Sequence, residues 1–157
     1  MISILTATED HIDQILNIEQ EAISPPWTHG LLLSEIYNVE SYFVVAAQTS
    51  LLSTSQEATQ IKGFIILRCT HFDAELLQIA VAINARSCGV GDMLMRAMLD
   101  HANEKTLDKL FLEVRKSNEP AITLYKKHGF KTLSHRKDYY TTPTEDAIIM
   151  EKILKIL

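Results

Sequence analysis

The chain has 157 residues and a formal net charge of −5 at pH 7. This length suits one domain over residues 1–157 that buries about two thirds of its unfolded surface without disulfides or a metal. The acidic balance argues against direct binding to nucleic acid, which normally needs a basic face. It would instead attract a basic protein tail as a partner.

The cysteines, the first residues and the apolar runs bear on the cellular compartment. Cys69 and Cys88 belong to no CxxC pair, which favours a reducing environment. The N-terminus lacks a basic segment and reaches Glu9 too soon for a signal peptide. No apolar run approaches the roughly twenty residues that cross a bilayer, and the histidines show no metal-ligand spacing. We therefore expect a cytoplasmic protein with no membrane partner and no metal.

Hydrophobic spacing and turn residues predict the elements of the first half of the chain. In order they are a strand at 2–6, a helix that begins after Thr8, a break at Ser24–Trp27, a helix from Thr28 to about Tyr37, and hairpin strands at 42–47 and 63–67. The segment Gln48–Gln60 between those two strands is rich in Ser, Thr and Gln and is longer than a usual hairpin loop. We expect it to be a mobile loop.

The second half of the chain alternates strands with helices. The predicted elements are a strand near 75–81, a glycine turn, a helix at about 90–104, a strand near 108–114, a helix near 119–128, and closing strands near 131–138 and 146–153. Strands punctuated by helices in this way indicate an α/β (α+β) domain. Its central sheet is expected to be mixed, mostly antiparallel and flanked by helices.

The most informative motif is Arg86–Gly91, between an apolar strand and a helix. Glycines at such a junction allow backbone N–H groups and the positive end of the helix dipole to close on an anion such as a pyrophosphate. The basic side chain of Arg86 supports that interpretation. Taken alone, however, a glycine at a helix start is at least as often simple turn chemistry.

Several motifs together identify a family that the chain resembles. Arg86, Gly89 and Gly91 match the cofactor loop of the GNAT acyl-CoA-dependent N-acetyltransferases. Further matches are Leu112–Arg115, Ser117–Asn118, Leu124–Tyr125, Gly129–Phe130, Asp138–Tyr140 and Glu145–Met150. This combination is similar to the GNAT branch of ribosomal-protein-alanine N-acetyltransferases, and the similarity covers nearly the whole chain.

The resemblance implies a GNAT fold, acetyl-CoA as cosubstrate and direct acetyl transfer in a ternary complex. The implied acceptor is the N-terminal alanine of a small-subunit ribosomal protein, presented on its basic N-terminal tail. Ala82–Ile83, where that branch commonly carries Asp-Pro, and the long Gln48–Gln60 segment leave the acceptor preference open. The alternatives are a GNAT enzyme for other protein N-termini, lysine or a small amine, and a noncatalytic CoA-binding module.

Two residues are candidates for the acid and base of this reaction. Glu113 lies in a strand of otherwise apolar residues, and the resemblance implies that it is the general base, acting directly or through water. Its alternative role is an ion pair with Arg115 on the same strand face. Tyr125 has the pattern of a core aromatic residue, whereas the resemblance implies that its hydroxyl protonates the departing thiolate.

The resemblance also assigns residues to the cofactor and acceptor sites. Cofactor contacts are implied for Ile79, Ala80, Val81, Arg86, Ser87, Cys88, Gly89, Val90, Gly91, Asp92, Asn118 and Tyr125. Residues 79–81 are equally a buried apolar strand, and Asn118 is equally a helix cap. Trp27 and Tyr139, with Tyr140, would line the acceptor site; core burial and cross-strand packing are the alternatives.

Overall fold

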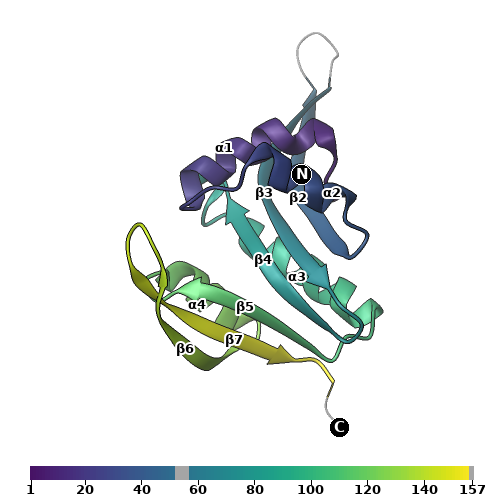
Figure 1. Ribbon diagram of the computed structural model, residues 1–157. Helices are drawn as coiled ribbons and strands as arrows, with labels where there is room; N and C mark the ends of the chain where they lie inside the picture. Colours follow the sequence, from purple (N-terminus) through teal and green to yellow (C-terminus); the bar gives the residue numbers. More distant parts are fainter. Residues whose placement is uncertain (52–56, 156–157) are drawn as a thin grey trace.

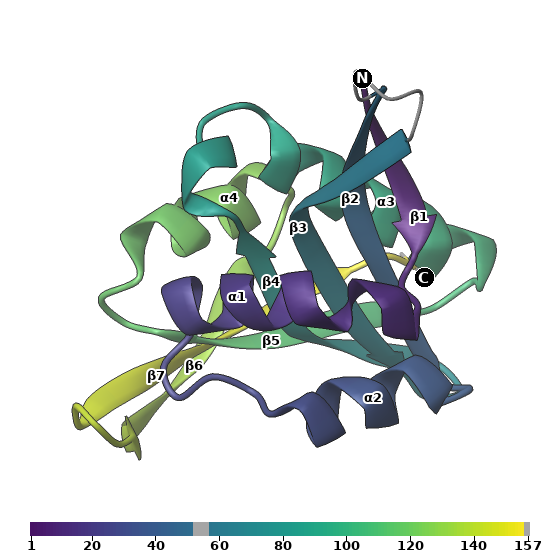
Figure 2. The ribbon, with the colours of Figure 1, turned by 90° about the horizontal axis from the view of Figure 1, so that it is seen from above.

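The structure, a computed structural model, describes residues 1–51 and 57–155. Its strands are β1 (Ile2–Thr6), β2 (Ser41–Leu51), β3 (Glu57–Cys69), β4 (Asp73–Val81), β5 (Lys109–Arg115), β6 (Lys131–Tyr140) and β7 (Glu145–Ile153). Its α-helices are α1 (Ile12–Ala22), α2 (His29–Tyr37), α3 (Val90–Glu104) and α4 (Glu119–Lys127), with short 3-10 turns at Glu9–His11 and Ile83–Ala85. Every predicted strand and helix is present, as Figures 1 and 2 show together. Among the described residues, no helix is long and apolar enough to cross a membrane.

The described strands form one mixed sheet in the order β1-β2-β3-β4-β5-β7-β6. Neighbouring strands are antiparallel except β4 and β5. That parallel pairing joins only Asp73–Leu76 to Lys109–Leu112. Beyond it the two strands diverge (Figure 1). The predicted fold class, with its mixed and mostly antiparallel sheet, is confirmed.

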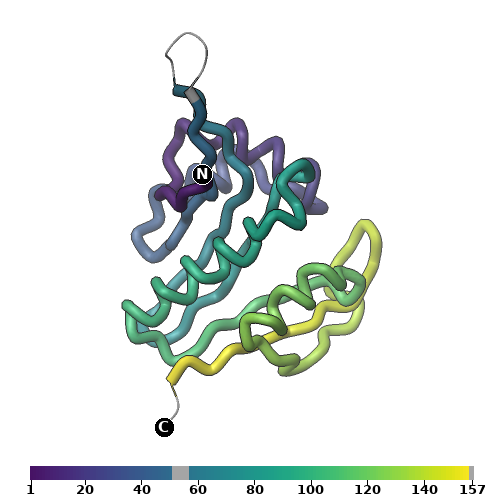
Figure 3. The backbone as a smooth tube through the Cα atoms, turned by 180° about the vertical axis from the view of Figure 1, so that it is seen from behind, coloured from purple at the N-terminus to yellow at the C-terminus, as the bar shows by residue number. Residues whose placement is uncertain are grey.

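Helices cover the two faces of the sheet unevenly. On one face α3 packs on β2, β3 and β4, and Tyr125 of α4 belongs to the same apolar cluster as Met95 of α3. On the other face α1 and α2 build a second core that includes Ile15, Leu32 and Phe64. Figures 2 and 3 show α1 and α2 on the β2–β4 half of the sheet and α4 behind the β5–β7 half. Side chains of β5 that point away from α4 therefore face a separate, more open surface.

The prediction that Gln48–Gln60 is a mobile loop is wrong for the residues that the structure describes. β2 and β3 continue into this segment as a two-stranded ribbon, in which Thr49 faces Thr59. Gln14 of α1 holds the ribbon, because its side-chain amide donates to the carbonyl oxygen of Thr59 at 3.1 Å. Paired threonines stabilise antiparallel strands, so a polar composition does not prevent strand formation. Residues 52–56 lie outside the described residues.

Candidate active site

A cavity of about 600 Å³ lies beside β4, where that strand has left β5. Its lining includes most of the predicted cofactor residues, namely Ile79, Ala80, Val81, Arg86, Ser87, Gly89, Val90, Gly91, Asp92 and Asn118. They come from three places in the chain: the end of β4, the turn that enters α3, and the residue that caps α4. The fold therefore brings residues 79–92 and Asn118 around one space.

The turn before α3 has the backbone geometry of an anion site. Gly89 caps the helix with a left-handed φ of 81°, and a Cβ atom added there would meet open space. The first N–H groups of a helix have no carbonyl partner within the helix, and the helix dipole adds positive potential at the same end. Gly91 brings α4 close, since an added Cβ would lie 3.3 Å from Leu124. This arrangement fits a pyrophosphate held by backbone donors.

The side chain of Asp92 connects the two helices that border the cavity. Its carboxylate lies 2.5 Å from Lys127 Nζ and 2.8 Å from His128 Nε2 at the end of α4. Hydrogen bonds from Lys127 and then His128 lower the pKa of Asp92 below its ordinary value. Any contact of Asp92 with a cofactor would therefore come from its backbone, as predicted for the whole turn.

Glu113 is the first residue of β5 after the parallel pairing with β4 ends. Its side chain is 26% exposed and lies on the face away from α4, with Oε1 3.4 Å from Nη1 of Arg136. The hydroxyl of Tyr139 hydrogen-bonds to the same carboxylate, which raises the pKa of that phenol. Arg115, the alternative partner, instead pairs with Glu145 at 3.4 Å. Glu113 also lines a second hollow of about 430 Å³ on this face.

Tyr125 and Cys88 lie outside the lining of the 600 Å³ cavity. Tyr125 is only 7% exposed and its ring packs 6.0 Å from that of Phe130, so the core role that its pattern indicates is real. Burial also raises the pKa of the phenol, which keeps it protonated. Its neighbour Leu124 does line the cavity. Cys88 is exposed, with Sγ 3.4 Å from the carbonyl oxygen of Arg86.

The predicted acceptor residues come from the α1–α2 connection and from the end of β6. Trp27 lies in the α1–α2 connection, half-buried against the second core. Tyr139, near the end of β6, is 45% exposed, and its ring meets that of Tyr140 edge-on at 5.1 Å. Core packing of the tryptophan is thus partly realised, whereas the contact between the tyrosines joins neighbours on one strand and is not cross-strand packing.

The site thus combines a glycine turn at the start of α3, the separation of β4 from β5, and a glutamate where these strands separate. Residues 12–130 match the family described as "Acetyltransferase (GNAT) family". The chain belongs to the GNAT family of acetyltransferases. The predicted resemblance and the GNAT fold that it implies are confirmed.

Named relatives are similar over nearly the whole chain. A [ribosomal protein bS18]-alanine N-acetyltransferase of Haemophilus influenzae is 34% identical over 141 residues, which cover 88% of this chain and 89% of the relative. The crystal structure of the ribosomal-protein-S18-alanine N-acetyltransferase from Escherichia coli has a TM-score of 0.86 at 28% identity, covering 100% of this chain and 96% of that one. Arabidopsis thaliana NAA60, crystallised with acetyl-CoA, has the same fold, with a TM-score of 0.84 at 13% identity over 98% of this chain and 99% of its own.

Three buried polar residues in the described part of this GNAT domain escape the sequence analysis, namely Glu19, Glu35 and Gln78. Glu19 of α1 is fully buried, and its Oε2 accepts the backbone N–H of Trp27 at 3.0 Å. Burial raises its pKa, while Trp27 and the side chain of Gln78 on β4 oppose that shift by hydrogen bonding. The available signal was a charged residue on an apolar helix face, since Glu19 follows Ile12 and Ile15 by seven and four positions. A polar residue within the apolar strand marks Gln78 in the same way.

We predict that Asp92→Asn weakens the fold in a pH-dependent manner. Because the folded pKa of Asp92 is lowered, its ion pairs stabilise the protein above the ordinary value of 3.8, and this contribution is lost as the pH falls through the folded pKa. The free energy of unfolding at pH 7 should drop by about 0.5–1 kcal/mol, since the pair is partly solvated.

Urea unfolding between pH 7 and pH 3 measures this difference, which should shrink below about pH 4. Asp108→Asn is the control, because Asp108 makes a longer and more exposed pair, 3.8 Å from Lys155. A deficit for Asp92→Asn that stays constant with pH would show that the contact is not electrostatic.

Proposed function

We propose that the protein transfers the acetyl group of acetyl-CoA to the N-terminal α-amine of an alanine on a small-subunit ribosomal protein. The observation that carries this proposal is the parting of β4 and β5, which has the anion-binding turn and cavity on one side and Glu113 on the other. Relatives that match 88% to 95% of the chain bear the name of that activity. Synthesis of ribosomal proteins places such an enzyme in the cytoplasm.

The cavity residues would hold the cosubstrate. Backbone N–H groups of Ser87–Asp92 would bind the pyrophosphate at the start of α3. Among the described strands, β4 has no partner on its β5 side after Leu76, so the peptide groups of Ile79–Val81 are free to pair with an extended arm. One of these N–H groups would stabilise the negative charge that develops on the thioester carbonyl oxygen.

Glu113 would act as the general base. A peptide α-amine has a pKa of about 7.7–8.0, so at neutral pH most of it is protonated and cannot attack a carbonyl. Glu113 would remove that proton, directly or through water. Arg136 and the Tyr139 hydroxyl both contact its carboxylate and hold it at the end of the β4–β5 pairing.

Tyr125 would act as the general acid. A phenol has an ordinary pKa of about 10 and is protonated at neutral pH, so it has a proton to donate to the departing thiolate, a group with a pKa of about 8.5 in cysteine. The acetyl group would pass directly to the amine in a ternary complex. A basic N-terminal tail would complement the net charge of −5.

The first experiment is acetylation of an equimolar peptide mixture, followed by mass spectrometry. It contains Ala-, Ser- and Met-started basic peptides and N-blocked lysine peptides. We expect preferential acetylation of the α-amine of the Ala-started peptides. Acetylation of another amine would move the acceptor assignment within the GNAT family, and binding of CoA without any acetylation would favour the noncatalytic module.

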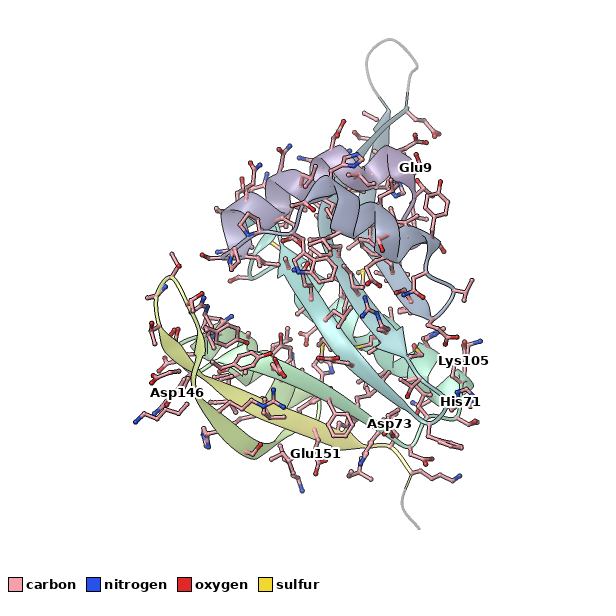
Figure 4. The ribbon with its side chains drawn as sticks, in the orientation of Figure 1. Glu9, His71, Asp73, Lys105, Asp146 and Glu151 are labelled. Atoms are coloured by element: carbon pink, nitrogen blue, oxygen red, sulfur yellow. The ribbon has the colours of Figure 1, made fainter. Side chains whose placement is uncertain are left out.

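Substitution Glu113→Gln should lower kcat by about 10²–10⁴, because the amide cannot accept the proton. The dissociation constant for CoA should stay within about twofold, since Glu113 does not line the 600 Å³ cavity. Glu151→Gln is the matched control. Glu151 lies on β7 (Figure 4) and is paired with Phe111, which is two residues before Glu113 on the same face of β5. An equal loss of CoA binding in Glu113→Gln would point to a structural role.

Substitution Tyr125→Phe separates the chemical role of Tyr125 from its packing role. Loss of the hydroxyl should lower kcat by about 10²-fold or more while the folded state persists, because the ring still fills the core. Tyr42→Phe is the control, since Tyr42 is partly buried and its hydroxyl donates to the carbonyl oxygen of Ala97 at 3.4 Å. Full turnover by Tyr125→Phe would show that the phenol is not the acid.

A further inference from the structure

We propose that Arg115 is a positioning residue for the acceptor. It fixes the two connections that border the Glu113 side of the sheet, the α1–α2 connection (23–28) and the β6–β7 connection (141–144). This proposal rests on the proposed function, because it takes the peptide to enter between these connections. From the sequence alone, the only role considered for Arg115 was an ion pair with Glu113.

The guanidinium of Arg115 reaches both connections at once. Its Nη2 donates to the carbonyl oxygens of Ser24 at 3.3 Å and Thr141 at 3.2 Å. Its Nη1 donates to the carbonyl oxygen of Pro143 at 3.0 Å and lies 3.4 Å from Glu145 Oε1. A planar group with several fixed donors suits this task, whereas an ammonium group does not. One side chain therefore joins a segment 91 residues before it in the sequence to another that lies 26 residues after it.

The surroundings of Arg115 hold it in this position. Its side chain is 18% exposed, and its guanidinium carbon lies 4.4 Å from the ring centre of Tyr140. Glu145 is held in turn by the backbone N–H of Ser117 at 2.6 Å. Hydrogen bonds from the Ser117 side chain and then from its backbone, together with Arg115, lower the pKa of Glu145. The aromatic ring and the fixed carboxylate leave the remaining donors directed at the loop carbonyls.

Arg115 also lies next to the proposed base. It is two residues from Glu113 on the same face of β5. The β6–β7 connection that it binds follows Tyr139 and Tyr140, and Tyr139 hydrogen-bonds to Glu113. Figures 1 and 2 show the α1–α2 and β6–β7 connections on the same side of the molecule. Figure 4 shows Asp146 near the β6–β7 connection, at the start of β7. A change in the Arg115 contacts would therefore alter the space in front of Glu113.

The groups to which the Arg115 side chain donates belong to residues that do not line the CoA cavity. Its lining comes from β4, the turn before α3 and the start of α4, together with Ala22. Removal of the Arg115 donors should thus weaken binding of the peptide and leave binding of acetyl-CoA nearly unchanged. A general loss of folding would affect both substrates.

The test compares Arg115→Met and Arg115→Lys with Arg68→Met. Arg68 pairs with the buried Glu35 and ties β3 to α2 instead of joining the two connections, so it is a matched control for loss of an arginine. We expect Arg115→Met to raise KM for the acceptor peptide at least about tenfold, as loss of several charged hydrogen bonds predicts. KM for acetyl-CoA should change less than about twofold, and Arg115→Lys should give a smaller rise, because it keeps the charge without the fork.

Trp27 gives a second measurement that needs no acceptor. It is the only tryptophan of the chain and lies in the α1–α2 connection three residues from Ser24. Acrylamide should quench its fluorescence more strongly in both Arg115 variants and equally in wild type and Arg68→Met. Should Arg115→Met fail to fold, Arg115→Lys carries both measurements.

The outcomes separate this proposal from the proposed function. Unchanged acceptor KM, or an equal rise in both KM values, overturns the role of Arg115 while the acetyltransferase assignment stands. If the wild-type protein acetylates no peptide, the proposed acceptor fails and the quenching decides alone: unchanged quenching of Trp27 in the Arg115 variants overturns the anchoring role, and increased quenching supports it.

Discussion

The early end of the pairing between β4 and β5 is the constraint on which the rest of the structure depends. The ladder stops at Leu76 and Leu112. At the same level, the neighbouring β3 residues Leu67 and Ile66 pair with Leu76 and Gln78 of β4. Leu77 is therefore an extra residue in β4. Such a bulge bends a strand and increases its twist. The bend frees one edge of β4 for a ligand and makes Glu113 the first β5 residue past the junction.

The two faces of the sheet respond differently to this parting. On the α3 and α4 face one apolar cluster runs from Ile65 of β3 through Leu112 of β5 to Met150 of β7, so the two halves of the sheet share a core. On the other face polar contacts take over, with Glu19 holding Trp27 and Arg115 holding two connections. Close packing supports one face with little freedom to move, and directional hydrogen bonds shape the other, where the peptide would bind.

Local signals account for what the sequence predicted well. The Thr28 side chain caps α2, Gly89 takes the left-handed conformation before α3, and Asn118 caps α4, each as its residue type indicates. What escaped prediction depends on long-range pairing, which has no signature in a short window. The Arg136 partner of Glu113 lies 23 positions away on β6, and the ribbon at Gln48–Gln60 depends on strand pairing and on Gln14 of α1. The polar composition of this segment suggested a loop, because composition carries no information about strand pairing or about a contact with a distant residue such as Gln14.

The positions of the proposed base and acid would set the path of the proposed reaction. Glu113 projects from β5 on the face away from α4, whereas its neighbours Leu112 and Val114 pack in the same cluster as Tyr125. The two groups therefore lie on opposite faces of the sheet, and a continuous sheet would separate them. A thioester can meet both only where β4 and β5 have parted, with the amine approaching from the Glu113 face and the thiolate leaving toward the Tyr125 face. On this assignment attack and departure would occur on opposite faces, an arrangement that is consistent with the proposed direct transfer in a ternary complex.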